Sequence, residues 1–137
     1  MSRSSEVDVN TRIPGSLYAV PDKFWGFRAV GRRDHPGACL FCYADRNAAL
    51  LSKGTDSRGG VAKNLDQPYH VLPSEKNGLN KPITFDLVPK RFRLKRVLLM
   101  EPDRKMGDLE SADLKAMQNE YRRIFMRDDA QGRQEQA

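Results

Sequence analysis

The sequence predicts an α+β domain in which two or more small antiparallel β-hairpins pack with one long C-terminal amphipathic helix and a short helix. Three observations predict this class. Apolar residues alternate over several short segments, Pro and Gly turn signals separate those segments, and apolar residues recur at helical spacing within 109–126. The length of 137 residues suits one domain. We expect this domain at 14–126, between an extended polar arm at 1–13 and a polar tail at 127–137.

The first predicted hairpin follows the turn signal Pro14-Gly15. Residues 16–20 alternate as a short strand, 21–23 form a turn, and 24–30 read as the partner strand. The next apolar segment, 38–43, is apolar on both parities. That pattern is typical of a strand buried on both faces or of the entry to a helix.

A short helix is predicted next, over 46–52, because Asp45 can cap its start and Gly54 can end it. Residues 53–68 are rich in Gly, Asp, Ser and Asn, which predicts a long loop. A short strand is expected over 69–72.

The clearest predicted hairpin has a first strand over 83–88, a turn at Pro89 and a basic return strand that reaches Met100. After it, residues 109–126 are expected to form the long helix, capped by Asp108 or Ser111. Its apolar stripe consists of Leu114, Met117, Tyr121, Ile124 and Phe125.

The strongest candidate surface is the basic segment 90–96, with five cations and no acidic residue. Strand alternation would project Arg91, Arg93 and Lys95 from one face and direct Phe92 and Leu94 into the core. A row of cations suits a polyanion or an acidic protein surface. The alternative is a solvated strand face, or an edge strand that its cations protect from aggregation. The candidate binding residues are Lys90, Arg91, Arg93, Lys95, Arg96, Arg32 and Arg33.

Charge and apolar patterning limit the function classes. The formal net charge is +6, which favours anionic partners. The longest apolar run, 38–44, is too short to span a membrane, and the N-terminus lacks the apolar core of a secretory signal. Since the chain has only two cysteines, we expect an intracellular, cytoplasmic location or a place in a virus particle.

The two cysteines and two histidines of the chain are His35, Cys39, Cys42 and His70. Together they have the composition of a tetrahedral zinc site, and the Cys-x2-Cys spacing fits one. The apolar neighbours of the cysteines favour ordinary core thiols instead, and a redox pair or disulfide is a third reading. We therefore expect no cofactor, with zinc as the alternative.

No set of catalytic residues is evident in the sequence, so we expect a protein that is not an enzyme. Trp25, with Phe24 and Phe27, is a core cluster or a base-stacking platform beside basic residues. The predicted function is a structural or binding component of a larger assembly, such as a virion or nucleoprotein particle. It would contact protein subunits or nucleic acid through the basic hairpin and its arms. The alternative is a small zinc-stabilised nucleic-acid-binding accessory or regulatory domain.

Overall fold

A seven-stranded sheet, antiparallel at every pairing, organises the computed structural model, which describes residues 9–26, 34–56 and 68–126. Its strands are β1 (Ser16–Pro21), β2 (Asp34–Tyr43), β3 (Ala48–Asp56), β4 (Pro68–Val71), β5 (Ile83–Asp86), β6 (Lys90–Arg93) and β7 (Lys105–Asp108). The longer helices are α2 (Leu94–Arg104) and α3 (Ser111–Tyr121). Shorter elements are the 3₁₀ helices η1 (Asp22–Trp25) and η2 (Ala44–Arg46) and the π-helical turn η5 (Arg122–Met126).

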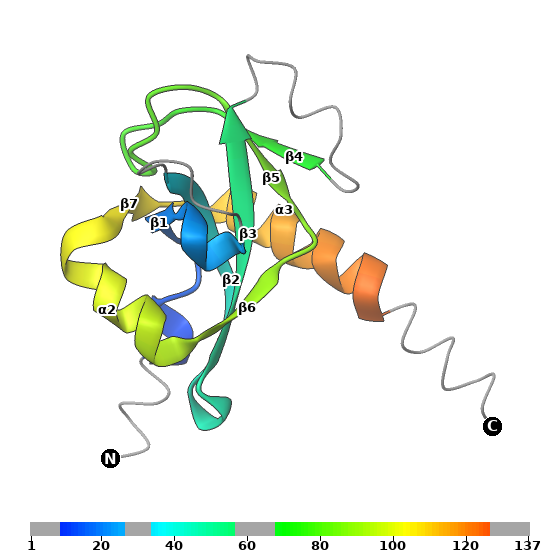
Figure 1. Cartoon of the computed structure of the whole chain (residues 1–137). Coiled ribbons are helices and arrows are strands. Elements are labelled where there is room, and N and C mark those ends of the chain that lie inside the picture. The colour runs from blue at the N-terminus through cyan, green and yellow to red at the C-terminus, as the bar shows by residue number, and fades with distance from the viewer. Residues whose placement is uncertain (1–8, 27–33, 57–67, 127–137) are drawn as a thin grey trace, which may run out of the picture.

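The strand order is β4-β5-β3-β2-β1-β7, and β6 pairs with β3 on the same edge as β5. The long strand β3 therefore carries two partners in succession. Its second half pairs with β5, with Gly54 opposite Phe85, and its first half pairs with β6, with Ala49 opposite Phe92. The strands curl as a half-barrel, and Figure 1 shows β5 and β6 following one another along β3.

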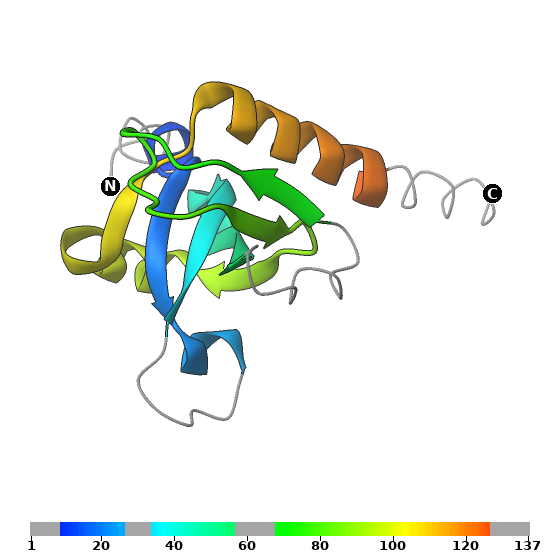
Figure 2. The same cartoon turned by 90° about the horizontal axis from the view of Figure 1, so that it is seen from above.

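Two apolar cores lie on the two faces of the sheet, with α2 over one and α3 over the other (Figures 1 and 2). Alternation along the strands divides the side chains between them. On β1, Leu17 belongs to the core beside α3, and its neighbour Tyr18 belongs to the core beside α2. The segment 38–43 is thus a strand buried on both faces, which confirms the first of the two interpretations of its pattern.

A bulge at Leu40 in β2 joins this strand to α3. The register with β3 shifts between Cys39 and Phe41, so the Leu40 carbonyl is outside the regular ladder. The Gln118 side chain of α3 donates a hydrogen bond to that carbonyl over 2.8 Å. The helix is further anchored by Met117, which is fully buried. Sheet and helix are therefore joined by both packing and a polar contact.

The predicted fold class is wrong in its architecture. Separate hairpins packed with one long C-terminal helix are replaced by a single large sheet with short helices. The helix predicted over 109–126 is an α-helix of 11 residues, followed by the π-helical turn η5. The predicted pattern was apolar at helical spacing, but Met117 alone of the stripe is fully buried. Most of the buried apolar side chains lie on strands, so the sheet dominates the fold.

Two local predictions are also wrong. The segment 46–52, predicted as a short helix, ends η2 and begins β3, because strand partners on both sides outweigh the helix propensity of Ala and Leu. The hairpin predicted around Pro89 does not form. Strands β5 and β6 run in the same direction along β3, with Pro89 in the short break between them. The basic strand ends at Arg93, where α2 begins, and does not reach Met100.

The remaining predictions fall partly outside the described residues. The strands expected over 16–20 and 69–72 are confirmed as β1 and β4. The strand partners of β1 are β2 and β7. The expected partner 24–30 begins within η1, and 27–30 lie outside the described residues. The extended polar arm expected over 1–13 is wrong in its described part, because residues 9–12 are helical and Ile13 is fully buried in the core beside α2. In the described part of the chain, no helix combines the length and apolar character needed to cross a bilayer.

Candidate functional site

The predicted basic residues meet where β6 passes into α2. Lys90, Arg91 and Arg93 are exposed on β6, while Phe92 between them is buried. Lys95 and Arg96 are exposed in the first turn of α2, where Leu94 is buried. The expected core positions of Phe92 and Leu94 are therefore confirmed. The single strand face expected for Arg91, Arg93 and Lys95 is wrong, because the chain becomes helical at Leu94.

Asn47 joins the turn after η2 to the start of α2. Its backbone is left-handed, with φ of 48°. Its carbonyl accepts a hydrogen bond from the Leu94 N–H over 3.1 Å, and its side-chain Oδ1 accepts one from the Lys95 N–H over 3.1 Å. The first N–H groups of a helix have no partner within the helix. Asn47 therefore acts as a cap supplied from a distant part of the chain, since the N-cap residue Arg93 makes no side-chain cap bond.

Replacing Asn47 with alanine is expected to reduce the free energy of unfolding by about 2 kcal/mol, because the cap bond is lost and alanine disfavours this backbone conformation. Asn47→Gly loses the same side-chain bond but tolerates the left-handed backbone. We expect it to cost about half as much. Denaturant unfolding of both variants measures the difference. A larger loss in the glycine variant would contradict this account of the backbone contribution.

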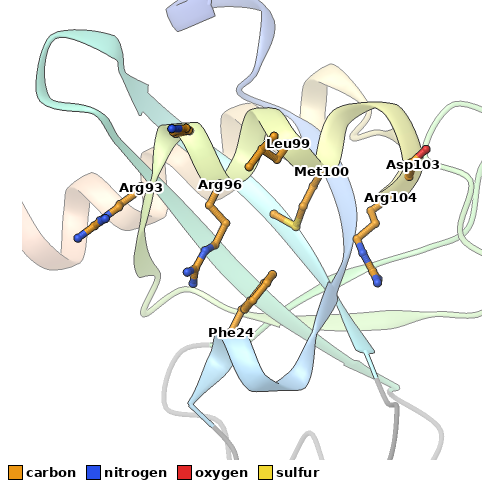
Figure 3. Close-up of a pocket in the computed structure, with 8 residues that line it drawn as sticks. Phe24, Arg93, Arg96, Leu99, Met100, Asp103 and Arg104 are labelled. Carbon is orange, nitrogen blue, oxygen red and sulfur yellow. The ribbon is translucent and has the colours of Figure 1, made fainter.

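The 3₁₀ helix η1 lies against the same region and supplies aromatic rings. Trp25 packs edge-on against Phe92, with ring centroids 5.2 Å apart. The Arg96 guanidinium lies 4.4 Å from the Phe24 ring centroid, and the Lys23 ammonium lies 5.3 Å from it. Both distances are within the range of cation–π attraction. In Figure 3, the Arg96 and Met100 side chains extend from α2 toward Phe24.

Three adjoining hollows cover this region, and we call them together the basic groove. The first, of about 310 Å³, is lined by Arg46, Asn47, Arg91, Phe92 and Arg93. The second, of about 410 Å³, shares the last three and adds Lys23, Phe24, Lys90 and Arg96. The third, of about 320 Å³ and drawn in Figure 3, is lined by Phe24, Arg93, Lys95, Arg96, Leu99, Met100, Asp103 and Arg104. Shared residues connect each hollow to the next.

The cations at the centre of the groove are not neutralised by the described part of the chain. Within residues 9–26, 34–56 and 68–126, no ion pair involves Lys90, Arg91, Arg93, Lys95 or Arg96. Asp103 is the one acidic residue among the described residues that line the groove. At the far end, Arg104 lies 3.8 Å from Asp34. The groove therefore presents a concentrated positive field to an incoming ligand.

The four residues considered for zinc have other contacts. His35 Nδ1 lies 2.5 Å from Asp22 Oδ1, which connects the start of β2 to η1. His70 Nδ1 lies 2.7 Å from the Thr84 hydroxyl, between β4 and β5. Cys39 and Cys42 are both buried in the core beside α2. Among the described residues, no three His, Cys, Asp or Glu side chains are grouped so that they could hold a metal ion.

The two thiols are held in their protonated form by burial. Desolvation, followed by the nearby Cys42, raises the pKa of Cys39 far above its usual range. Desolvation raises the pKa of Cys42 to about 11, against an opposing effect of Arg12. Metal binding and nucleophilic chemistry require the thiolate. The environment of these side chains is therefore that of core thiols.

A separate hollow of about 510 Å³ lies between β2, the end of β3 and the 79–83 segment. Its charged groups pair with described residues: Asp56 lies 3.2 Å from Lys81, and Asp34 lies 3.8 Å from Arg104. His35 also lines it and contacts Asp22. This hollow therefore has mixed and largely paired charge, unlike the basic groove.

Sequence reasoning found part of the basic groove. Arg46 was missed because 46–52 was read as a helix, and Lys23 and Arg104 were missed because only packing brings them to β6. Asn47, which follows Arg46 in the sequence, is a usable turn signal, because asparagine tolerates the left-handed backbone. Arg32 and Arg33 lie outside the described residues.

The chain matches no family model, no curated protein and no solved structure.

Proposed function

We propose that this chain is a non-enzymatic component of a nucleoprotein assembly that binds nucleic acid through the basic groove. The observation that carries this proposal is the row of exposed cations from Lys90 to Arg96, which have no ion-pair partner among the described residues and line three connected hollows. A solvated surface disperses its cations among carboxylates, as around Lys105, which lies near both Glu101 and Asp108. The centre of the groove lacks such pairing among the described residues, so its counter-charge is expected to come from a partner.

Nucleic acid fits the groove better than an acidic protein surface for two reasons. Arginine predominates over lysine among the groove cations, and its planar guanidinium makes two-pronged contacts with phosphate. The groove also extends over three hollows, so a ligand with regularly repeated negative charge can follow it. Each phosphate contact releases condensed counterions, which supports binding independent of sequence.

The decisive experiment measures binding of a labelled DNA oligonucleotide by fluorescence anisotropy across a series of salt concentrations. We expect affinity to fall steeply with salt. The variant Arg91→Glu/Arg93→Glu/Arg96→Glu is expected to bind at least roughly 100-fold more weakly, because phosphate contacts are replaced by repulsion.

A matched control reverses three exposed cations outside the groove, Lys76→Glu/Lys115→Glu/Arg123→Glu, and changes the net charge by the same amount. It is expected to lose far less affinity. Equal losses in the two triple variants would reduce the effect to net charge and contradict the groove. Stronger binding of polyglutamate than of DNA at equal ionic strength would assign the groove to acidic proteins instead.

A further inference from the structure

The basic groove contains apolar surface that phosphate binding alone does not require. Leu99 on α2 is 71% exposed and lines the third hollow between cationic neighbours. Met100 and the aromatic ring of Phe24 line the same hollow. Apolar side chains gathered with an aromatic ring in one hollow form a surface that an apolar or aromatic group of a ligand can cover. The ligand of this hollow is therefore expected to present apolar or aromatic surface together with negative charge.

The Phe24–Arg96 pair brings an aromatic ring and a guanidinium together in this hollow. The guanidinium carbon lies 4.4 Å from the Phe24 ring centroid, so the cation covers the ring at contact distance. Nucleobases stack on aromatic rings and on guanidinium planes, and such stacking tolerates any base. Arg93 and Lys95 line the same hollow, where they can contact the phosphates of a strand whose base is stacked there.

From this juxtaposition we infer that the basic groove selects single-stranded nucleic acid and receives an unpaired base in the hollow formed by Phe24, Arg96, Leu99 and Met100. The inference rests on the proposed function. In a duplex the base faces are stacked on one another, so none of them is free to stack on a side chain. A duplex therefore meets the cations but leaves the apolar part of the hollow uncovered.

The test compares three probes: a single-stranded DNA, the duplex form of the same DNA, and an abasic single strand of the same length. The duplex is used at half the molar concentration of the single strands, so that the total phosphate concentration is the same for all three. We expect the full chain to bind the normal single strand about tenfold to hundredfold more tightly than the abasic strand, in line with stacking of one or two bases. Leu99→Ala and Phe24→Leu are expected to remove most of this preference. Binding of the abasic strand, which keeps the phosphates, is expected to fall much less in both variants than binding of the normal strand.

Leu72→Ala is the matched control, because Leu72 is also 71% exposed but does not line the groove. It should retain the full preference. Because Leu99 is so exposed, its alanine variant tests the hollow even if Phe24→Leu disturbs the fold. Equal affinity for all three probes, with binding still lost in the Arg91/Arg93/Arg96 triple variant, would overturn the base-stacking inference alone. If none of the three probes binds in a salt-dependent way, the proposed function itself is overturned.

Discussion

Asn77→Ala is expected to reduce the free energy of unfolding by about 3 kcal/mol or more. The Asn77 side chain is fully buried and holds the turn between β4 and β5. Its Oδ1 accepts hydrogen bonds from the N–H groups of Ser74 and Leu79, over 2.9 and 3.0 Å, and its Nδ2 donates to the Leu72 carbonyl over 2.9 Å. Alanine would leave backbone groups without these partners, at about 1–3 kcal/mol for each group that stays buried.

Denaturant unfolding of the unchanged protein and of the Asn77→Ala variant measures this loss of stability. Asn80→Ala provides the control, since Asn80 is exposed in the same segment and is expected to change stability by less than about 0.5 kcal/mol. If Asn77→Ala were no more destabilising than Asn80→Ala, water would be replacing the side chain and the turn would not depend on it.

The strands that the sequence predicted correctly are those with strong local signals. β1 follows a Pro-Gly turn and alternates, and β2 is apolar on both parities because each face meets a different core. The partner of β1 was wrong because the sequence does not record which strand is adjacent in space. Segments close in the chain were paired as hairpins, while the actual pairing of β1 is with β2 and β7.

The strand β3 shows why propensity alone fails in this protein. Its first residues, Ala48, Ala49 and Leu50, favour a helix when they are considered in isolation. In the fold they lie between β2 and β6, and the hydrogen bonds of both ladders outweigh that preference. Asn47 reverses the chain before β3 in a left-handed conformation, so the turn comes earlier than the glycine signal at Gly54 suggested.

The candidate site was half predictable for a related reason. The cations of 90–96 are contiguous in the chain, so composition alone reveals them. The groove exists because α2 turns away at Leu94 and η1 returns to pack Trp25 against Phe92. That packing is a long-range event and leaves no periodic trace in the sequence. The sequence suggests a stacking role for Phe24 and a binding role for Arg96, but only the fold shows that the two side chains are in contact.

Gly107→Ala is expected to cost at least about 3 kcal/mol, because β7 lies against the backbone of Lys76 and Asn77 with no room for a side chain. A Cβ at Gly107 would lie 2.6 Å from the backbone carbonyl atoms of Asn77 and from the Lys76 carbonyl oxygen. The adjacent Asp108 N–H donates to that same Lys76 carbonyl over 2.9 Å, so the two segments cannot separate without losing this bond. Overpacking against backbone costs more than overpacking against a flexible side chain.

Gly26→Ala separates close approach from backbone strain. Gly26 has a positive φ of 89°, and among the described residues a Cβ there would meet only the flexible Lys90 ammonium at 3.6 Å. Its cost is expected to be about 1 kcal/mol, from the backbone conformation alone.

Since Gly107 and Asn77 are in contact, their effects should not add: once Asn77→Ala has loosened the turn, Gly107→Ala should cost clearly less than it does alone. Denaturant unfolding of the two single variants and the double variant measures this coupling, and strict additivity would show that the turn and β7 are stabilised independently.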